Sequence, residues 1–190
     1  MEEKPEEEII REAKKNPQAF SLIFEKYYQP IFGYILRRTA NVALAEDLTS
    51  QTFIKAYKNF KRFQWRNIPI SAWLYKIATN EVNSYYRKKK SFSNLSLEEI
   101  KEIANDQNLI EEIQRSEEEL QKYQDFLKLH KKIVQLPPKY QTVITLRFFE
   151  KKKIKEIAQI LGKPEGTIKA QIHRALLLLR KMLKEETSFS

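Results

Sequence analysis

The chain has no cysteine, only three glycines among its 190 residues, and no apolar run long enough to cross a membrane. The lack of cysteine excludes disulfides, and two histidines, His130 and His173, are too few to build a zinc site from nitrogen and sulfur ligands. Three glycines argue against strand-and-turn architecture and against a glycine-rich phosphate loop. Gly162 and Lys163 do not form such a loop, because Ile157 stands where the upstream glycine is needed. We therefore expect no metal and no other cofactor.

Composition also bounds the size of the fold and its location. With 42% apolar residues, the chain can bury one large or two small hydrophobic cores. Five of the first eight residues are glutamates, whereas a signal peptide starts with basic residues and continues with an apolar run. The sequence therefore predicts a cytoplasmic protein without a membrane span.

Charge is distributed unevenly along a chain whose net charge is +10. Residues 17–90 contain 13 Lys and Arg against 4 Asp and Glu, and residues 136–184 contain 12 against 3, so each block carries +9. Residues 91–125 contain 3 against 10, a charge of −7. Two basic blocks indicate two surfaces that meet polyanions such as nucleic acid, although lysine enrichment for solubility explains the charge alone equally well.

Residues 154–174 predict two helices joined by a tight turn, the helix-turn-helix that places a helix in the major groove of DNA. Apolar residues at helical spacing give the first helix one buried face: Ile154, Ile157, Ala158 and Leu161. Gly162 ends this helix, and Pro164 suits the start of the next. The inward stripe of the second helix is Ile168, Ile172, Ala175, Leu179 and Leu183.

The opposite side of this second helix is mostly polar and can meet base edges and phosphates. The candidate residues are Thr167, Lys169, Ala170, His173 and Arg174, with Gln171 at the flank. Leu177 is expected on the exposed side as well, where an apolar residue favours a protein contact over a phosphate contact.

The first basic block predicts three helices before residue 61. The first begins near Phe20 and ends at Gln29, because the residue before Pro30 avoids helical geometry, and a second runs over residues 31–36. Asn41 is suited to cap a third helix over residues 42–60. The inward residues of this third helix are Ala45, Leu48, Thr52, Phe53, Ala56 and Phe60.

The outer side of the helix over residues 42–60 is unusual for a face that meets only solvent. Acidic, hydroxyl, amide, aliphatic and basic side chains recur there at helical spacing, at Asp47, Ser50, Gln51, Ile54 and Lys58. This mixture favours a docking face for another protein. A solvated face is the alternative.

A segment rich in aromatic and basic residues follows over residues 60–69, and then a helix that we expect Ser71 to cap. The side expected to face inward is apolar and consists of Trp73, Leu74, Ile77, Ala78, Val82 and Tyr85. The side expected to face outward is polar and consists of Lys76, Thr79, Asn80, Asn83 and Arg87. Tyr75 and Tyr86 lie at the margin between the two sides. Aromatic rings stack on unpaired bases while Lys and Arg follow the backbone, so this block suits single-stranded nucleic acid. Core packing is the alternative, favoured for Phe63 and Trp73 and open for Trp65 and Tyr86.

The remaining segments also predict helices. Residues 91–97 indicate a flexible joint, and residues 109–134 carry apolar residues at heptad spacing, which favours one long helix ending before Pro137. His130 lies on this apolar seam and is expected to pack rather than to act. A further helix from Pro138 would turn Val143, Ile144, Leu146 and Phe148 toward the helix-turn-helix. No segment predicts a strand, so the expected fold class is all-α, with two small helical domains joined by an acidic linker.

Several of these segments, taken together, resemble a known family. Residues 45–57 are similar to the polymerase-docking helix of the bacterial sigma-70 family of RNA polymerase sigma factors, and residues 72–80 to its promoter-melting segment. The markers of its fourth region are matched by Leu136-Pro137, Glu156-Ile157-Ala158, Gly166-Thr167-Ile168-Lys169 and Arg174-Ala175. The order of these pieces identifies the chain as a member of the compact extracytoplasmic-function (ECF) group, which keeps only regions 2 and 4.

The resemblance implies a division of the chain. Residues 1–16 would be a charged amino-terminal segment, 17–90 region 2, 91–122 a partly helical acidic linker, 123–184 region 4, and 185–190 a tail. Region 2 would dock on the clamp helices of the largest polymerase subunit through Asp47, Ser50, Gln51, Ile54 and Lys58. It would hold the melted minus-10 strand, with one base flipped into a loop pocket, through Phe63, Trp65, Arg66, Asn67, Lys76, Asn80, Asn83 and Arg87.

Region 4 would read the minus-35 duplex through Thr167, Lys169, Ala170, Gln171, His173 and Arg174. The implied function is to direct core RNA polymerase to specific promoters and to assist promoter melting. The implied partners are the clamp helices and flap of the polymerase core, promoter DNA and an anti-sigma factor. We expect no enzyme activity, because carboxylates such as Glu46 and Asp47 have no partner base, nucleophile or metal ligand set.

Two other functions fit parts of the sequence. A stand-alone helix-turn-helix regulator would bind duplex DNA as a dimer, but it would have no use for a docking face or a melting segment. A helical adaptor that uses the heptad seam as its interface would leave the two basic blocks unexplained.

Overall fold

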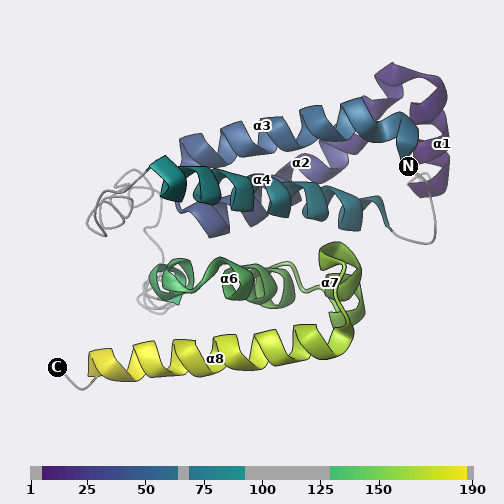
Figure 1. The fold of residues 1–190 in the computed structure, drawn as a ribbon. Helices are drawn as coiled ribbons and strands as arrows, with labels where there is room; N and C mark the ends of the chain where they lie inside the picture. The colour runs from purple at the N-terminus through teal and green to yellow at the C-terminus, as the bar shows by residue number, and fades with distance from the viewer. Residues whose placement is uncertain (1–5, 64–68, 93–128, 188–190) are drawn as a thin grey trace, which may run out of the picture.

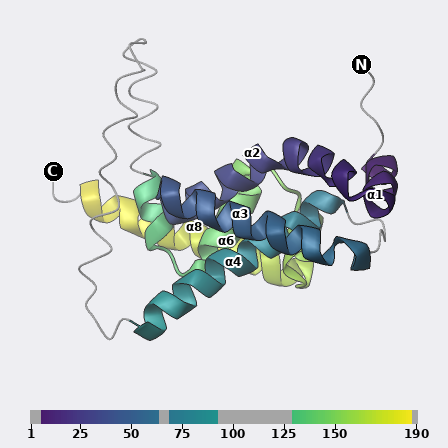
Figure 2. The same cartoon turned by 90° about the horizontal axis from the view of Figure 1, so that it is seen from above.

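A computed structural model describes residues 6–63, 69–92 and 129–187, in which helices and turns occur but no strand. The helices are α1 (Glu6–Lys15), α2 (Phe20–Thr39), α3 (Val42–Asn59), α4 (Ile70–Phe92), α6 (Pro138–Ile144), α7 (Ile154–Leu161) and α8 (Glu165–Thr187). Short 3-10 turns form η1 (Pro17–Ala19) and η2 (Phe60–Arg62), and a π-helical turn forms η5 (Thr145–Phe149). Figure 1 shows two layers, α1–α4 and α6–α8, and Figure 2 shows the first layer lying over the second. The all-α prediction is confirmed.

The prediction that a helix ends before Pro30 is wrong, because α2 continues through this proline to Thr39. A proline inside a helix costs about 3 kcal/mol. Ile23 before it and Ile31 and Tyr34 after it are all almost fully buried on one core, and each such side chain contributes about 1.5–3 kcal/mol. Burial on both sides of Pro30 therefore outweighs the local preference for a break.

The prediction for α3 is confirmed at its start and along its inner side. The Asn41 side-chain oxygen accepts a hydrogen bond from the backbone N–H of Leu44 at 2.7 Å, which satisfies one of the free donors of the first turn. All six residues predicted to face inward are buried. These contacts fix α3 against α2 and α4, and they leave its opposite side exposed.

Three expectations for α4 are wrong. The helix starts at Ile70, where the Ala72 N–H donates to the Pro69 carbonyl at 2.9 Å, so Ser71 lies inside the first turn and does not cap it. Thr79, predicted to face outward, is only 4% exposed, and its hydroxyl shares a hydrogen bond of 2.8 Å with the Tyr34 hydroxyl. Tyr75, expected at the margin, is fully covered. The reason is tertiary, since α4 packs on α2 and α3 and is also covered by α7.

Two apolar residues of the second layer also depart from the prediction. Phe148 is 52% exposed because residues 145–149 form a π turn, closed by the Glu150 N–H donating to the Thr145 carbonyl, which rotates this side chain away from the α-helical stripe. Leu183 is 38% exposed. Inward residues of α8 follow one another at spacings of three or four, and the one after Leu179 is Met182, which packs on the core in place of Leu183.

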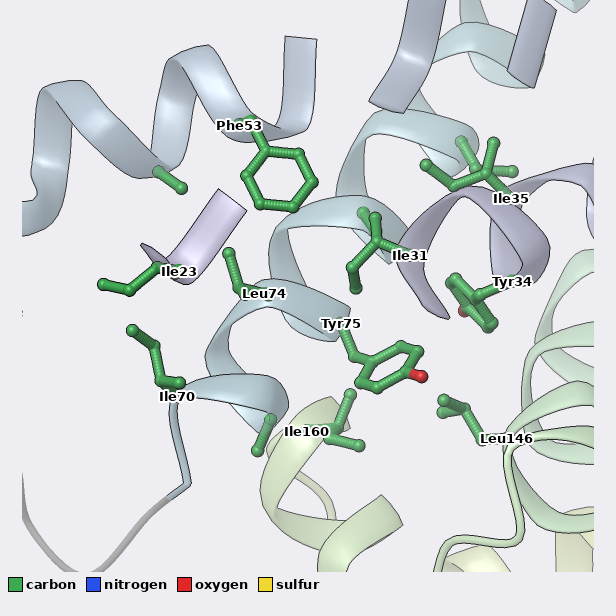
Figure 3. Close-up of a cluster of buried hydrophobic side chains, with 14 of the residues drawn as sticks. Ile23, Ile31, Tyr34, Ile35, Phe53, Ile70, Leu74, Tyr75, Leu146 and Ile160 are labelled. Atoms are coloured by element: carbon green, nitrogen blue, oxygen red, sulfur yellow. The ribbon is translucent and has the colours of Figure 1, made fainter. Parts of the chain in front are cut away.

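The two basic blocks share one hydrophobic core. Leu146, Ile157 and Ile160 from the second layer belong to the same buried cluster as residues of α2 and α4, and Figure 3 shows Leu146 and Ile160 beside Tyr75 and Tyr34. A smaller cluster holds the second layer itself together, with Ile133, Leu136, Tyr140, Ile144, Ala175 and Leu179. Apolar periodicity does not reveal this joint core, because it shows that a face is apolar but not which helix will cover that face.

The predicted joint over residues 91–97 and the predicted long helix over residues 109–134 lie largely outside the described residues. Residues 129–135 are helical. His130 is half-buried there, and its Nε2 atom lies 2.9 Å from the Arg37 carbonyl oxygen. It packs against the first layer, which agrees with the expected structural role.

Candidate nucleic-acid interface

The predicted docking residues form one stripe on α3, which we call the docking stripe: Asp47, Ser50, Ile54 and Lys58 are exposed, and Gln51 is half-buried. Ile54 is 52% exposed, unusually high for an isoleucine in a helix that has a well-packed inner side. The Gln51 amide donates to the Asp47 carboxylate at 2.8 Å and fixes both polar heads. In Figure 1, α3 lies at the edge of the molecule far from α7 and α8, so the second layer does not cover the stripe.

The described residues predicted to hold single-stranded DNA lie on α4 and just before it. Lys76, Asn80, Asn83 and Arg87 are all exposed along one side of α4, as predicted. Phe63 is only 8% exposed and packs against Trp73, with ring centres 4.8 Å apart and ring planes tilted by 37°. The Phe63 ring therefore serves mainly in packing. Core packing was the alternative that the sequence favoured for both Phe63 and Trp73. Trp65, Arg66 and Asn67 lie outside the described residues.

A pocket of about 400 Å³ opens beside this side of α4. Its lining combines two aromatic side chains, two amides, one aliphatic side chain and four charged groups: Lys55, Asn59, Arg62, Phe63, Trp73, Lys76, Ile77, Asn80 and Glu81. Flat rings, amides and cations are the groups that hold an unstacked base and its phosphate. The sequence pattern had indicated Phe63, Lys76 and Asn80, and its aromatic and basic segment included Arg62 of η2. It missed Lys55 and Asn59, which both lie on α3.

Glu81 is a further residue of the pocket that the sequence pattern missed. Its side chain is 8% exposed, and it accepts a hydrogen bond from the Lys55 ammonium at 2.6 Å. The detectable signal was a lone carboxylate in a basic block, at an inward position next to Val82. A buried glutamate needs a cationic partner, and here the pairing ties α3 to α4 at the rim of the pocket.

A buried arginine orients one of the predicted DNA-binding amides. Arg38 is 1% exposed, and its guanidinium donates to the Asn83 side-chain oxygen at 2.9 Å. The Asn83 oxygen is thereby occupied from below, so its NH₂ group is presented outward as a donor. Tyr86, left open by the sequence, donates to the Arg38 carbonyl at 3.1 Å, and burial raises the pKa of its hydroxyl, with Arg38 opposing the change. Tyr86 is therefore a supporting residue.

The predicted helix-turn-helix is confirmed in α7 and α8. Gly162 adopts φ = 63°, the left-handed conformation that ends a helix, and the N–H groups of Gly162 and Lys163 both donate to the Ala158 carbonyl. The Pro164 carbonyl then accepts from the N–H groups of Thr167 and Ile168, so α8 starts at Glu165. At the start of α7, the Glu156 carboxylate accepts from the Lys153 N–H at 2.7 Å.

The candidate base-reading residues form an exposed face over the first turns of α8, which we call the recognition face. Thr167, Lys169, Ala170, His173 and Arg174 are exposed, while Gln171 is half-buried at the flank, as predicted. Opposite them, Ile168, Ala175 and Leu179 are buried and hold the helix against α6 and α7. The first turns of α8 can therefore enter a major groove while its other side stays in the protein core.

The described residues contain no cluster of three or more His, Asp or Glu that could hold a metal ion. Within those same ranges, no helix is both long and apolar enough to span a bilayer.

Models of known families match both parts of the chain. The model for sigma-70 region 2 matches residues 23–92, which cover most of α2 together with α3 and α4. The model for sigma-70 region 4 matches residues 126–179, which include α6, α7 and most of α8.

Solved structures support the fold. The chain is similar to CnrH in its complex with the cytosolic domain of CnrY, with a TM-score of 0.67, 18% identity, and coverage of 95% of this chain and 97% of that one. It is also similar to the sigma factor RpoE in complex with the anti-sigma factor NepR from Bartonella quintana, with a TM-score of 0.65, 22% identity, and coverage of 87% and 96%.

Curated relatives extend along nearly the whole sequence. The ECF RNA polymerase sigma factor SigW of Bacillus subtilis (strain 168) is 36% identical over 183 residues, which cover 93% of this chain and 95% of the relative. The ECF RNA polymerase sigma factor BldN of Streptomyces coelicolor is 30% identical over 182 residues, which cover 94% of this chain and 66% of the relative. The helices α2–α4 and the helix-turn-helix of α7 and α8 lie within the residues that the two family models match. The chain therefore belongs to the sigma-70 family, in its ECF group of RNA polymerase sigma factors.

Proposed function

We propose that this sigma factor performs its task with three separate exposed surfaces. A sigma factor directs core RNA polymerase to promoters and assists their melting, and membership of the family gives this chain that function. The observation that carries the division of labour is the presence of the docking stripe, the exposed side of α4 and the recognition face on different elements of one chain.

The docking stripe on α3 would bind the clamp helices of the largest polymerase subunit. Ile54 provides exposed apolar area at its centre, and Asp47 and Lys58 provide charges of both signs around it. An apolar centre with a polar rim is the usual composition of a protein interface. In this chain the remoteness of α3 from α8 leaves the stripe accessible while DNA occupies the other surfaces.

The exposed side of α4 and the neighbouring pocket would hold the melted minus-10 strand. Lys76 and Arg87 can follow the phosphates, and the amides of Asn80 and Asn83 can bond to base edges. Flipping a base out of the duplex costs a few kcal/mol, which stacking and hydrogen bonds in the pocket must offset. Trp65, Arg66 and Asn67 stay in this proposal on the strength of the sequence alone.

The recognition face would read the minus-35 duplex and bind its backbone. A bidentate contact from Lys169 or Arg174 to a guanine discriminates by about 1–3 kcal/mol. His173 and Thr167 lie on the same exposed side and can bond to phosphates or base edges. Gln171, at the flank, would contact the groove wall or the neighbouring backbone.

A second protein surface lies farther along α8. Leu176, Leu177 and Leu178 are exposed there although leucine is usually buried. We propose that this apolar patch meets protein, either the polymerase flap or an anti-sigma factor. The solved RpoE structure, in which that sigma factor is bound to the anti-sigma factor NepR, supports the second partner.

Sigma factors are DNA-binding initiation factors of the cytoplasm rather than enzymes, and we assign this chain the same place and the same absence of catalysis. The stand-alone dimeric regulator considered above is not favoured, because the match to region 2 covers residues 23–92, which that function would leave unused.

Reconstitution with core polymerase and a promoter library tests the proposal. We expect the isolated chain to bind duplex DNA weakly and to select promoters with minus-10 and minus-35 elements only in the presence of core polymerase. Tight footprinting of a duplex operator by the chain alone, with no gain from polymerase, would favour the dimeric regulator.

A further inference from the structure

A positive charge is buried beneath the exposed side of α4. Arg38, in the last turn of α2, is only 1% exposed. A guanidinium is always charged in a protein, and the burial of a charge is costly unless an opposite charge meets it. Among the residues that the structure describes, no carboxylate forms an ion pair with Arg38. The cost of burying this charge is therefore not offset by an ion pair.

The groups that meet the guanidinium are neutral. One N–H group donates to the Asn83 side-chain oxygen at 2.9 Å and another to the Tyr34 hydroxyl at 3.3 Å, and the Tyr34 ring centre lies 5.8 Å away. The last carbonyl groups of α2 add a partial negative charge. The buried Nε atom has no hydrogen-bond partner in the part of the chain that the structure describes. Because only dipoles compensate the charge, an apolar side chain in its place should destabilise the fold little.

Arg38 fixes which way the Asn83 amide points. A guanidinium has N–H donors and no acceptor, so the Asn83 atom that faces it must be the oxygen. A rotated amide would direct its NH₂ group at the guanidinium, with donor against donor. Asn83 is exposed, and its NH₂ group is therefore held outward. Asn80, one turn earlier on the same exposed side, has no hydrogen bond within the described ranges, so its amide can turn either way.

The fixed orientation limits what Asn83 can recognise. An asparagine that can use both ends of its amide pairs with adenine, accepting from N6 and donating to N7. Asn83 can only donate, so it cannot form this bidentate pair. Its donors are also strengthened, because hydrogen bonds in a chain polarise one another and this chain starts at a cation. The groups that suit such a donor are the oxygen acceptors of a nucleic acid, in base keto groups and phosphates.

We propose that Arg38 is a positioning residue that locks Asn83 as a donor to one oxygen acceptor of the melted minus-10 strand. This oxygen belongs either to the keto group of a base or to a phosphate. The proposal rests on the assignment of α4 to this strand given above. It adds that the bidentate adenine contact is excluded at the position that Asn83 meets. Arg38 itself does not touch the DNA, because it is buried.

A double-mutant cycle tests whether Arg38 acts through Asn83. The measurement is the affinity of the holoenzyme, formed by the full chain and core polymerase, for a labelled single-stranded minus-10 oligonucleotide. Arg38→Met and Asn83→Ala should each weaken binding about three- to tenfold, the effect of one hydrogen bond. In the Asn83→Ala protein, Arg38→Met should have no further effect. Additive effects of the two substitutions, or no effect of either, would overturn the proposal.

Asn80→Ala is the matched control, because Asn80 is an exposed amide on the same side of α4 that does not meet Arg38. In the Asn80→Ala protein, Arg38→Met should weaken binding as much as it does alone. Denaturant unfolding establishes that each variant is folded, and the midpoint of Arg38→Met should lie close to that of the unchanged protein. If Arg38→Met does not fold, Arg38→Gln replaces it, because a neutral amide donates or accepts and leaves Asn83 free to turn.

Modified oligonucleotides identify the oxygen. One set replaces each phosphate in turn by a methylphosphonate, and a second set removes the keto oxygen of each base in turn. At one position, the modification should weaken binding by the unchanged protein but not by Asn83→Ala or Arg38→Met. A position in the first set assigns a backbone contact, and a position in the second assigns a base contact. If no position depends on both residues, the lock is wrong.

Lys76→Ala and Arg87→Ala separate this proposal from the proposed function of α4. Both substitutions remove an exposed cation from the same side of the helix. If they weaken binding of the strand while the cycle of Arg38 and Asn83 is additive, α4 holds the strand and only the lock fails. If neither weakens binding, the assignment of α4 to the minus-10 strand fails, and the lock fails with it.

Discussion

The guanidinium of Arg38, buried beneath the exposed side of α4, donates to the side-chain oxygen of Asn83 at 2.9 Å. Asn83→Asp would place a carboxylate against this buried positive charge. We expect an increase of a few tenths to about 1 kcal/mol in the free energy of unfolding, since Asn83 is exposed and solvent screens the new pair. Binding of single-stranded minus-10 DNA should fall, because the new negative charge faces phosphates.

Asn80→Asp serves as the matched control for that variant. It adds the same charge one turn earlier on the same exposed side of α4. We expect weaker DNA binding without a gain in stability, measured by denaturant unfolding and by fluorescence anisotropy with a labelled strand. Equal DNA binding by Asn83→Asp and the unchanged protein would remove Asn83 from the DNA-binding surface.

On the docking stripe, Asp47→Ala should weaken binding to core polymerase with little loss of fold stability. The carboxylate is exposed and accepts a hydrogen bond from Gln51 on the same stripe. Its removal should therefore change the free energy of unfolding by no more than about 0.5 kcal/mol. Glu46→Ala removes a neighbouring exposed carboxylate outside the stripe and should leave the affinity unchanged. Identical polymerase affinities for both variants, by titration, would argue against this stripe.

On the recognition face, Lys169→Ala and Arg174→Ala should separate base contacts from phosphate contacts. Loss of a bidentate base contact should cost about 1–3 kcal/mol at a single promoter position. Loss of a phosphate contact should weaken all sequences alike and reduce the salt dependence by about one unit of slope. Arg180→Ala, on the later part of α8, is the control. Both losses can be measured as the affinity of the holoenzyme for minus-35 variants at several salt concentrations. If neither substitution changes this affinity, the recognition face does not contact the minus-35 element.

Asn41→Ala should destabilise the fold through α3. Its side chain caps the helix at 2.7 Å, and loss of such a cap costs about 1 kcal/mol, in a range of about 0.5–2. A loss of this size lowers the unfolding midpoint by about 2–4 °C in a chain of this length. Asn41→Asp keeps the acceptor and should retain most of the stability. A thermal unfolding curve of Asn41→Ala that matches the unchanged protein would show that the cap contributes nothing.

Acidification should destabilise the folded chain through His130. Burial is the main cause that lowers the pKa of His130 below the ordinary 6.5, against the opposing effect of its bond to the Arg37 carbonyl. The unfolded chain therefore takes up a proton near pH 6.5 while the folded chain stays neutral, and stability falls as the pH drops from 6.5 toward the folded-state pKa.

His130→Gln keeps a donor for the Arg37 carbonyl but cannot titrate. The free energy of unfolding is compared at two pH values, about one unit above and about one unit below pH 6.5. On going from the higher to the lower pH, we expect it to fall less in this variant than in the unchanged protein. Denaturant unfolding at the two pH values measures the difference. Parallel losses in both proteins would assign the pH dependence to other groups.

Local patterns were sufficient for much of this molecule. The spacing of apolar residues predicted the inner side of α3, Asn41 predicted its start, and Gly162 and Pro164 predicted the turn between α7 and α8. The order of the motifs predicted the family. These features depend on contacts within a few residues of each other, namely a cap, a left-handed glycine and a 3.6-residue period, and a sequence displays such contacts directly.

Only the tertiary structure decided what happens where distant helices meet. It carried α2 through Pro30, buried Thr79 and Tyr75 on a side of α4 expected to be exposed or marginal, and brought Lys55 and Glu81 together at a pocket. It also joined Glu150 to Arg37 and Tyr75, residues 113 and 75 positions away in the sequence. Periodicity shows that a face is apolar or that a charge is present, but burial energies and ion pairs depend on which segment arrives opposite, and that choice is made by the packing of the whole chain.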